Sequence, residues 1–263
     1  MENKLTVGNL LDQYGRLVEK GYSNKLVKHY ERARIKARKN KIKETNFYFF
    51  GNSEYGFFIE ITDNWLYKLA EVGFYDLKRG FQYSKSYYKL FSKKDFFISE
   101  SDNSLENYFK NNKILISIKN FENYKKIYVV AEKFDGKNDF ACDLKAFNES
   151  SNAIVVSCSL DDEKEFCYFQ KSLNYKLEGF LRIENQIYDV APLETSFKWS
   201  RAVMPYINMI LTHGGPFKDV DTASYSVQYS AAHGYASGSS GERMPTENAV
   251  IEITRQYKEI RLK

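Results

Sequence analysis

The segment SFKWSRAVMPY, residues 196–206, decides how this chain is interpreted. A long series of strand-like segments precedes it, and a segment rich in Ser, Ala, Gly and Tyr follows it. Side chains two residues apart on an extended strand point to the same face, so Trp199, Arg201 and Val203 are expected to lie together. A guanidinium can stack on an indole ring, and a buried guanidinium needs an anionic partner or ligand. Arg201 is therefore either half of a structural ion pair across a β-barrel or part of a ligand site.

The segments between residues 45 and 190 predict the fold class. Apolar and polar residues alternate there with period two, and the chain is rich in the strand formers Tyr (21) and Phe (20). About ten strands are expected, with no sustained helix between them. The lack of βαβ alternation argues against a parallel nucleotide-binding sheet. The clearest predicted hairpins span residues 47–62, 113–131 and 175–190.

Residues 23–43 form a basic stretch, in which nine Lys and Arg residues accompany a single acid, Glu31. Ser23 is a candidate N-cap, and the apolar spacing after it predicts a short helix, with the first strand beginning at Ile35. The basic stretch is interpreted as a solvated edge that discourages strand aggregation. The alternative is a surface for nucleic acid or for weak contact with an anionic membrane. We expect no nucleic-acid partner, because no nucleic-acid-binding motif accompanies the charge.

Other features exclude several classes of protein. No apolar run approaches the roughly 18 residues of a membrane span, and the N-terminus has no apolar signal core, so a cytoplasmic protein without a transmembrane segment is expected. The three cysteines lack metal-ligand spacing and lie in strand-like runs, which predicts buried structural thiols and no metal site. The glycine-rich residues 213–245 lack the strand–loop–helix context of a phosphate loop. No cofactor is therefore expected.

Motifs at both ends of the chain resemble those of the bacterial family known as domain of unknown function 2804. That family carries an Asp-Trp-Gly-Arg-Gly motif, then a Trp-Pro-Tyr-like element and glycine-rich strands ending in Thr-Glu-Asn. Trp199 and Arg201 match the first motif, whereas Lys198 stands where the family has Asp. Ser200 and Ala202 replace the two glycines of that first motif. The remaining matches are Leu10-Leu11-Asp12, Gly15-Arg16-Leu17-Val18, Ile35-Lys36-Ala37, Ile42-Lys43-Glu44, Pro205-Tyr206 and Thr246-Glu247-Asn248.

The resemblance implies a fold. The family is grouped with the calycins, whose members include lipocalins, carotenoid hydratases of the hydroxyneurosporene synthase type and tocopherol-cyclase-like proteins. An all-β protein is therefore expected, built as one antiparallel lipocalin-like barrel or as a pair whose second barrel is abbreviated, with a short N-terminal helix. The expected divisions are an N-terminal arm at 1–44, a first barrel or sandwich at 45–170 and a second, incomplete barrel at 171–263.

Three functions are compatible with these features. The first is binding of an apolar small molecule in a barrel cavity. The second is a hydratase or cyclase for an isoprenoid-like substrate, which needs a neutral carboxylic acid to protonate the alkene; Glu247 is the candidate by its motif position. The third is a basic interaction protein that acts through the basic stretch. The candidate ligand-binding residues are Trp199, Arg201, Tyr206, His213 and Asn248.

Overall fold

A computed structural model describes residues 4–90, 94–101, 106–148, 153–160 and 162–204. These residues divide into two compact units. Unit 1 is made of the described residues within 1–43, 154–170 and 200–204, and unit 2 of those within 44–153 and 171–199. Each unit is described by itself.

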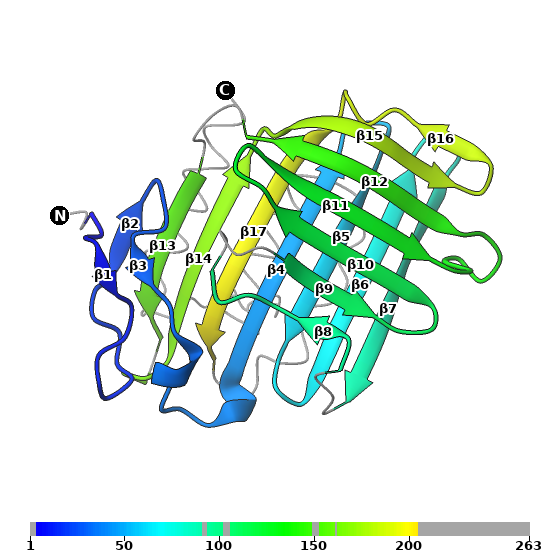
Figure 1. Cartoon of the computed structure of the whole chain (residues 1–263). Helices are drawn as coiled ribbons and strands as arrows, with labels where there is room; N and C mark the ends of the chain where they lie inside the picture. The colour runs from blue at the N-terminus through cyan, green and yellow to red at the C-terminus, as the bar shows by residue number, and fades with distance from the viewer. Residues whose placement is uncertain (1–3, 91–93, 102–105, 149–152, 161, 205–263) are drawn as a thin grey trace, which may run out of the picture. The chain divides into compact units, whose positions relative to one another are not determined.

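Nearly all of the described secondary structure is β-strand, and Figure 1 labels each element. One sheet lies wholly in unit 2 and has the strand order β16 (Gln186–Tyr188), β15 (Lys176–Ile183), β12 (Phe140–Phe147), β11 (Tyr124–Ala131), β10 (Ile114–Asn120), β9 (Glu106–Lys110) and β8 (Phe96–Phe97). The second sheet has the order β2 (Gly21–Ser23), β13 (Ala153–Ser159), β14 (Phe166–Leu173), β17 (Glu194–Val203), β4 (Ile42–Gly51), β5 (Tyr55–Asp63), β6 (Tyr67–Asp76) and β7 (Phe81–Leu90). A two-residue parallel pairing joins β1 (Gly8–Asn9) and β3 (Lys28–His29).

The all-β antiparallel prediction is confirmed, but the described strands form open sheets in place of a closed barrel. Neither large sheet pairs its first strand with its last within the described part of the chain. Barrel closure requires the two edge strands to form a ladder with each other. In the seven-stranded sheet these edges are β8, with two residues, and β16, with three, so they present too little backbone for such a ladder.

The predicted N-terminal α-helix is wrong. The described part of the basic stretch holds β3 and two single-turn 3₁₀ helices, η1 (Arg32–Arg34) and η2 (Lys39–Lys41), and the adjoining strand β4 begins at Ile42 rather than at Ile35. The reason is visible in the burial pattern: Lys28 and Tyr30 are buried while His29 between them is exposed. That alternation has the period of a strand, and it overrides the weak helical spacing.

The predicted hairpins are confirmed, and short polar side chains shape their turns. Between β4 and β5, the Asn52 Oδ1 atom accepts hydrogen bonds from the backbone N–H groups of Glu54 (2.8 Å) and Tyr55 (3.0 Å). Such Asx turns fix the register of the strands that follow. In the ladder of β4 and β5, Phe50 lies opposite Phe57, so the apolar faces of the two strands lie on the same side of the sheet.

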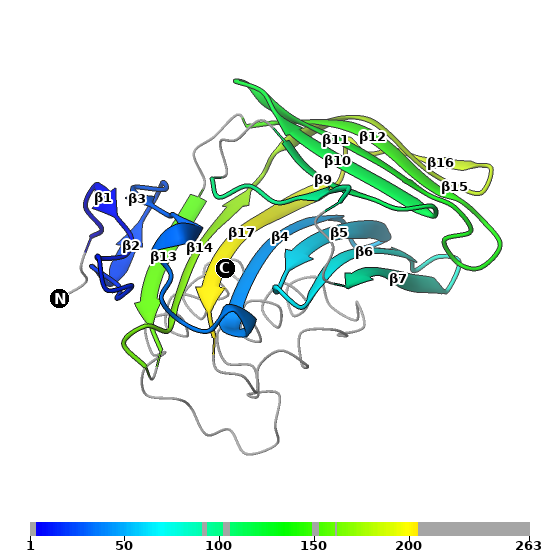
Figure 2. The same cartoon turned by 60° about the horizontal axis from the view of Figure 1, so that its bottom comes forward.

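Unit 2 is a two-layer structure around one aromatic-rich core. Figure 2 shows β4–β7 in one layer and β9–β12 with β15 and β16 in the other. Rings from the two layers meet: Phe57 on β5 lies 5.8 Å from Phe140 on β12, and Phe74 on β6 lies 5.0 Å from Tyr188 on β16. Each such ring pair contributes about 0.5–1.5 kcal/mol beyond the area it buries. The two layers therefore stabilise each other through a shared interior.

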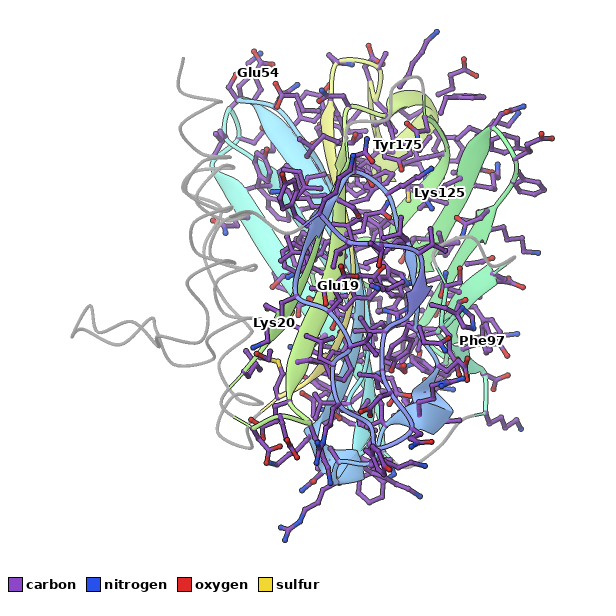
Figure 3. All side chains as sticks on the ribbon, turned by 90° about the vertical axis from the view of Figure 1, so that its left-hand side faces the viewer. Glu19, Lys20, Glu54, Phe97, Lys125 and Tyr175 are labelled. Atoms are coloured by element: carbon purple, nitrogen blue, oxygen red, sulfur yellow. The ribbon has the colours of Figure 1, made fainter. Side chains whose placement is uncertain are left out.

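The outer face of the seven-stranded sheet is turned to solvent. Along β15 the residues Leu177, Leu181 and Ile183 are buried, whereas their neighbours in between are exposed. Phe97, labelled in Figure 3, follows buried Phe96 on β8 and is 47% exposed on this outer side. One buried and one solvated face is the usual state of an antiparallel sheet.

Unit 1 has its own small core and a buried ion pair. Residues of β13, β14 and the end of β17 form an apolar cluster that includes Val156, Cys167 and Ala202. The Lys28 ammonium, 3% exposed, binds the Glu19 carboxylate at 2.5 Å (Glu19 is labelled in Figure 3). Burying a charge is tolerated only when it is paired in this way.

We predict that Gly179→Ala destabilises unit 2 much more than Gly136→Ala. Both glycines have positive φ, +125° and +90° respectively, so both changes incur backbone strain of about 1–3 kcal/mol. A Cβ at residue 179 would also lie 2.0 Å from the Asp143 carbonyl oxygen, whereas one at 136 meets open space. Urea unfolding measures the difference; equal stability of the two variants would contradict the described pairing of β12 and β15.

We also predict an acid-dependent loss of stability at Glu19. The hydrogen bond from Lys28, then those from Thr6, lower the pKa of Glu19 from 4.5 to about 2. Because the folded pKa is depressed, this contribution is complete above the unfolded value of 4.5 and is lost as the pH falls towards 2. Thermal melting of wild type and Glu19→Gln should differ at pH 6 and converge near pH 2. A difference that stays constant across this range would refute the assignment.

Candidate functional site

A row of four charged residues crosses the inner face of one layer of unit 2. Three successive ladder pairs join these residues across the sheet. Glu44 on β4 lies opposite Asp63 on β5, and Asp63 lies opposite Lys68 on β6. Lys68 in turn lies opposite Lys89 on β7. All four continue the apolar inward faces of their strands, since they lie an even number of residues from members of the core. We call them the charged row. Two anions and then two cations thus stand side by side at the end of an apolar interior.

The centre of the charged row is a fully buried ion pair. The Lys68 Nζ atom donates a 2.5 Å hydrogen bond to Asp63 Oδ1, and both side chains are 3% exposed. The same Oδ1 atom accepts the backbone N–H of Trp65 at 2.7 Å, where the chain turns with a positive φ. The Lys68 ammonium also lies 5.8 Å above the ring of Phe96 from the opposite layer. Asp63 therefore fixes both the β5–β6 turn and the position of Lys68.

The inner face of the edge strand β7 carries a second group of polar side chains, Lys85, Tyr87 and Lys89, which we call the β7 triad. Tyr87 belongs to the core of unit 2 and is 5% exposed. Its hydroxyl has no hydrogen-bond partner among the residues that the structure describes. Lys85 Nζ lies 5.9 Å from the centre of the Tyr87 ring, and Lys89 Nζ lies 5.5 Å from that of Phe109.

Burial makes Tyr87 a neutral hydrogen-bond donor. Desolvation, assisted by the nearby Tyr83, raises the pKa of Tyr87 to about 12. The phenol is therefore protonated at neutral pH and able to donate its O–H. A buried hydroxyl without a partner costs about 1–3 kcal/mol, and an oxygen supplied by a ligand would remove that cost.

The structure describes two of the residues predicted from the sequence as ligand-binding. Trp199 and Arg201 lie on β17, 4% and 0% exposed, and Arg201 Nη1 donates to the carbonyl oxygen of Ser200 at 2.7 Å. Arg201 is the largest fully buried side chain of the described residues, as expected for a guanidinium on an inward face. The remaining predicted residues, Tyr206, His213, Glu247 and Asn248, lie outside the described residues.

The basic stretch is partly neutralised within unit 1. Lys28 binds Glu19, Arg34 binds Glu31 at 2.9 Å, and Lys41 binds Glu165 at 2.5 Å. A surface built for nucleic acid would keep such cations available to phosphates. These contacts hold three cations of the basic stretch within unit 1, and Lys28 among them is buried rather than solvated.

The three cysteines are buried free thiols. Cys142 lies in the core of unit 2, and burial raises its pKa well above the ordinary value. Cys158 lies in unit 1, where its Sγ donates to the Cys167 carbonyl oxygen at 3.6 Å. A search of the described residues finds no group of three His, Cys, Asp or Glu side chains able to hold a metal ion. None of the described helices has the length and apolarity to cross a bilayer.

Reasoning from the sequence missed both the charged row and the β7 triad, although the signal was present. Period-two alternation places Asp63 on the face of Ile59 and Ile61, and Lys68 on the face of Ala70 and Val72. A charge at an inward position of a strand is an exception to the pattern. Such exceptions mark either a structural ion pair or a site.

A model of the family described as domain of unknown function (DUF2804) matches residues 2–213, and a model described as phosphoenolpyruvate hydrolase-like matches residues 182–260. The crystal structure of a candidate AttH protein from Nitrosomonas europaea is similar with a TM-score of 0.41 and 10% identity, over 63% of this chain and 52% of that chain. The chain thus spans about half the length of that protein. No curated protein matches.

We predict that Lys68→Met destabilises unit 2 by about 3–5 kcal/mol, because it leaves the Asp63 carboxylate buried without its cation. The matched control is Lys126→Met on β11, which removes an ion pair to Asp143 whose two side chains are each 33% exposed. Such a partly exposed pair contributes only about 0–1 kcal/mol. Denaturant unfolding compares the two variants. Equal destabilisation would show that the Asp63–Lys68 pair is not buried.

Proposed function

The chain belongs to the DUF2804 family, and from the geometry of its own residues we propose that unit 2 binds a small molecule with an apolar body between its two sheets. The observation that carries this proposal is the Tyr87 hydroxyl, buried in the core with no hydrogen-bond partner among the described residues. Buried polar groups in folded proteins are nearly always hydrogen-bonded, so an exception calls for an explanation. A ligand oxygen is the partner that fits a neutral phenol donor.

The surroundings of the β7 triad suit an apolar ligand body. Phe96, Ile98 and Phe109 lie in the opposite layer and belong to the same core as Tyr87. Phe96 and Phe109 meet edge to face at 6.2 Å. Small-molecule sites combine apolar walls of this kind with a few polar groups that orient the ligand.

The β7 triad also lies at an edge that a ligand could approach. β7 ends one sheet of unit 2, and β8 ends the other. An edge strand has backbone partners on one side only, so it separates from its layer at a lower cost than a central strand. We infer that the ligand enters between β7 and β8.

A hydratase or cyclase is less well supported. Protonation of an alkene requires a neutral carboxylic acid, and the candidate acid Glu247 lies outside the described residues. Asp63 accepts a hydrogen bond from the Lys68 ammonium, so it is present as a carboxylate, which cannot donate a proton. The acid that the motif offers therefore has no described position, and Asp63 does not take its place.

We place this activity in the cytoplasm. Free thiols at Cys142, Cys158 and Cys167 agree with a reducing compartment, where disulfides are rare.

The test is retention of a ligand by the purified protein. After incubation with a cellular lipid extract and gel filtration, native mass spectrometry should detect a bound small molecule. Tyr87→Phe should weaken binding of that molecule about 2- to 10-fold, the value of one hydrogen bond. The matched control, Tyr128→Phe, alters a tyrosine that is 37% exposed on the solvated face of β11, and it should leave binding unchanged. Failure to retain any molecule would refute the proposal.

A further inference from the structure

We propose that the ligand of unit 2 is a long-chain carboxylic acid, whose carboxylate is bound by the β7 triad. This inference rests on the proposed function, and it adds the charge and the chemical class of the ligand. Its anchors are the Tyr87 hydroxyl and the ammonium groups of Lys85 and Lys89.

The three anchors lie in a line on one strand. Residues two apart on a strand share a face and are about 7 Å apart, so Lys85 and Lys89 flank Tyr87 on the inner side of β7. The position of Lys85 Nζ over the Tyr87 ring agrees with this arrangement. The two lysines therefore lie on either side of Tyr87 along the strand.

The two ammonium groups retain hydrogen-bonding capacity. Among the described residues, Lys85 Nζ donates to the Lys133 carbonyl oxygen at 2.7 Å, and Lys89 Nζ donates to that of Lys94 at 2.7 Å. Both acceptors are uncharged, and an ammonium has three donors. Lys89 Nζ also lies 3.9 Å from the carboxylate of Asp95, whose side chain is 47% exposed.

The local charge therefore favours an anion. Among the described residues, Lys89 pairs with Asp95 at 3.9 Å, and the hydrogen bond of Lys85 goes to an uncharged carbonyl oxygen. The neighbouring Lys68 differs, because Asp63 neutralises it at 2.5 Å. Within the described inner face of β6 and β7, positive charge is thus in excess at the β7 triad and balanced at Lys68.

A carboxylate fits this arrangement better than other anions. It carries one negative charge and two oxygens, which match a neutral phenol donor and an ammonium donor. A phosphate carries nearly two charges at neutral pH, so its transfer to the same apolar surroundings costs more. The rings of Phe109, 5.5 Å from Lys89 Nζ, and of Phe96 beside it would contact the hydrocarbon chain.

The test compares three ligands with the same chain: dodecanoate, methyl dodecanoate and dodecanol. Isothermal titration of the full chain at pH 7.5 should show that dodecanoate binds about 10-fold or more tightly than the ester, because charge-assisted hydrogen bonds are made only to the acid. The double variant Lys85→Met/Lys89→Met should remove this preference and leave ester binding within about 2-fold. Lys85→Arg/Lys89→Arg should retain it, which separates loss of charge from loss of fold.

The outcomes distinguish this inference from the proposed function. Equal affinities for dodecanoate and its ester would overturn the carboxylate assignment and leave the binding of an apolar molecule standing. Retention of the preference in the double Met variant would overturn the assignment of the anchors. If none of the three ligands binds and lipid extracts yield no bound molecule, the proposed function fails and the inference with it. Lys126→Met, on the outer face of β11, is the control for a general effect of positive charge.

Discussion

The rule that a charge inside an apolar core must be neutralised there governs unit 2. β5 and β6 turn back on each other so that Asp63 and Lys68 are ladder partners, and the pair closes at 2.5 Å with both side chains 3% exposed. The same carboxylate binds the backbone N–H of Trp65 in the turn. Hairpin register, turn geometry and charge balance therefore depend on one another. A slip of one residue between β5 and β6 would place the two charges on opposite faces of the sheet and break the pair.

The proposed function rests on the part of unit 2 where polar groups lack such partners among the described residues. At Lys68 the ammonium is neutralised by Asp63 at 2.5 Å and also donates to the Trp65 carbonyl oxygen at 3.4 Å, so we regard this pair as structural. At Tyr87 a neutral donor is buried with no hydrogen-bond partner among the described residues, and two lysines on the same face are held mainly by uncharged carbonyl oxygens. The ion-paired Lys68 on β6 and the β7 triad lie on neighbouring strands of one sheet. Their different hydrogen-bond partners are the reason that we treat the first as structural and the second as a candidate site.

Period-two alternation was sufficient to predict the fold class and the hairpins, because each strand buries one apolar face and the turns between them carry short polar residues. It failed at the N-terminus, where Lys28 is buried against Glu19, since a sequence does not show which lysine finds a distant acid. The expectation of a closed barrel rested on the family resemblance. The edge strands β8 and β16 of the seven-stranded sheet are too short to pair with each other and close it. Trp199 and Arg201 are buried on β17, where residues on both faces are buried, whereas the β7 triad was missed because Lys and Tyr at a strand edge ordinarily face water.

The most direct test of this account is the environment of the Tyr87 hydroxyl. Carbon-13 labelling of the tyrosine ring allows the Cζ resonance of Tyr87 to be assigned by its loss in Tyr87→Phe. The account predicts that saturating dodecanoate shifts this resonance, as the phenol gains an acceptor, and leaves that of exposed Tyr128 in place. A Tyr87 resonance that does not move while dodecanoate is bound would contradict it.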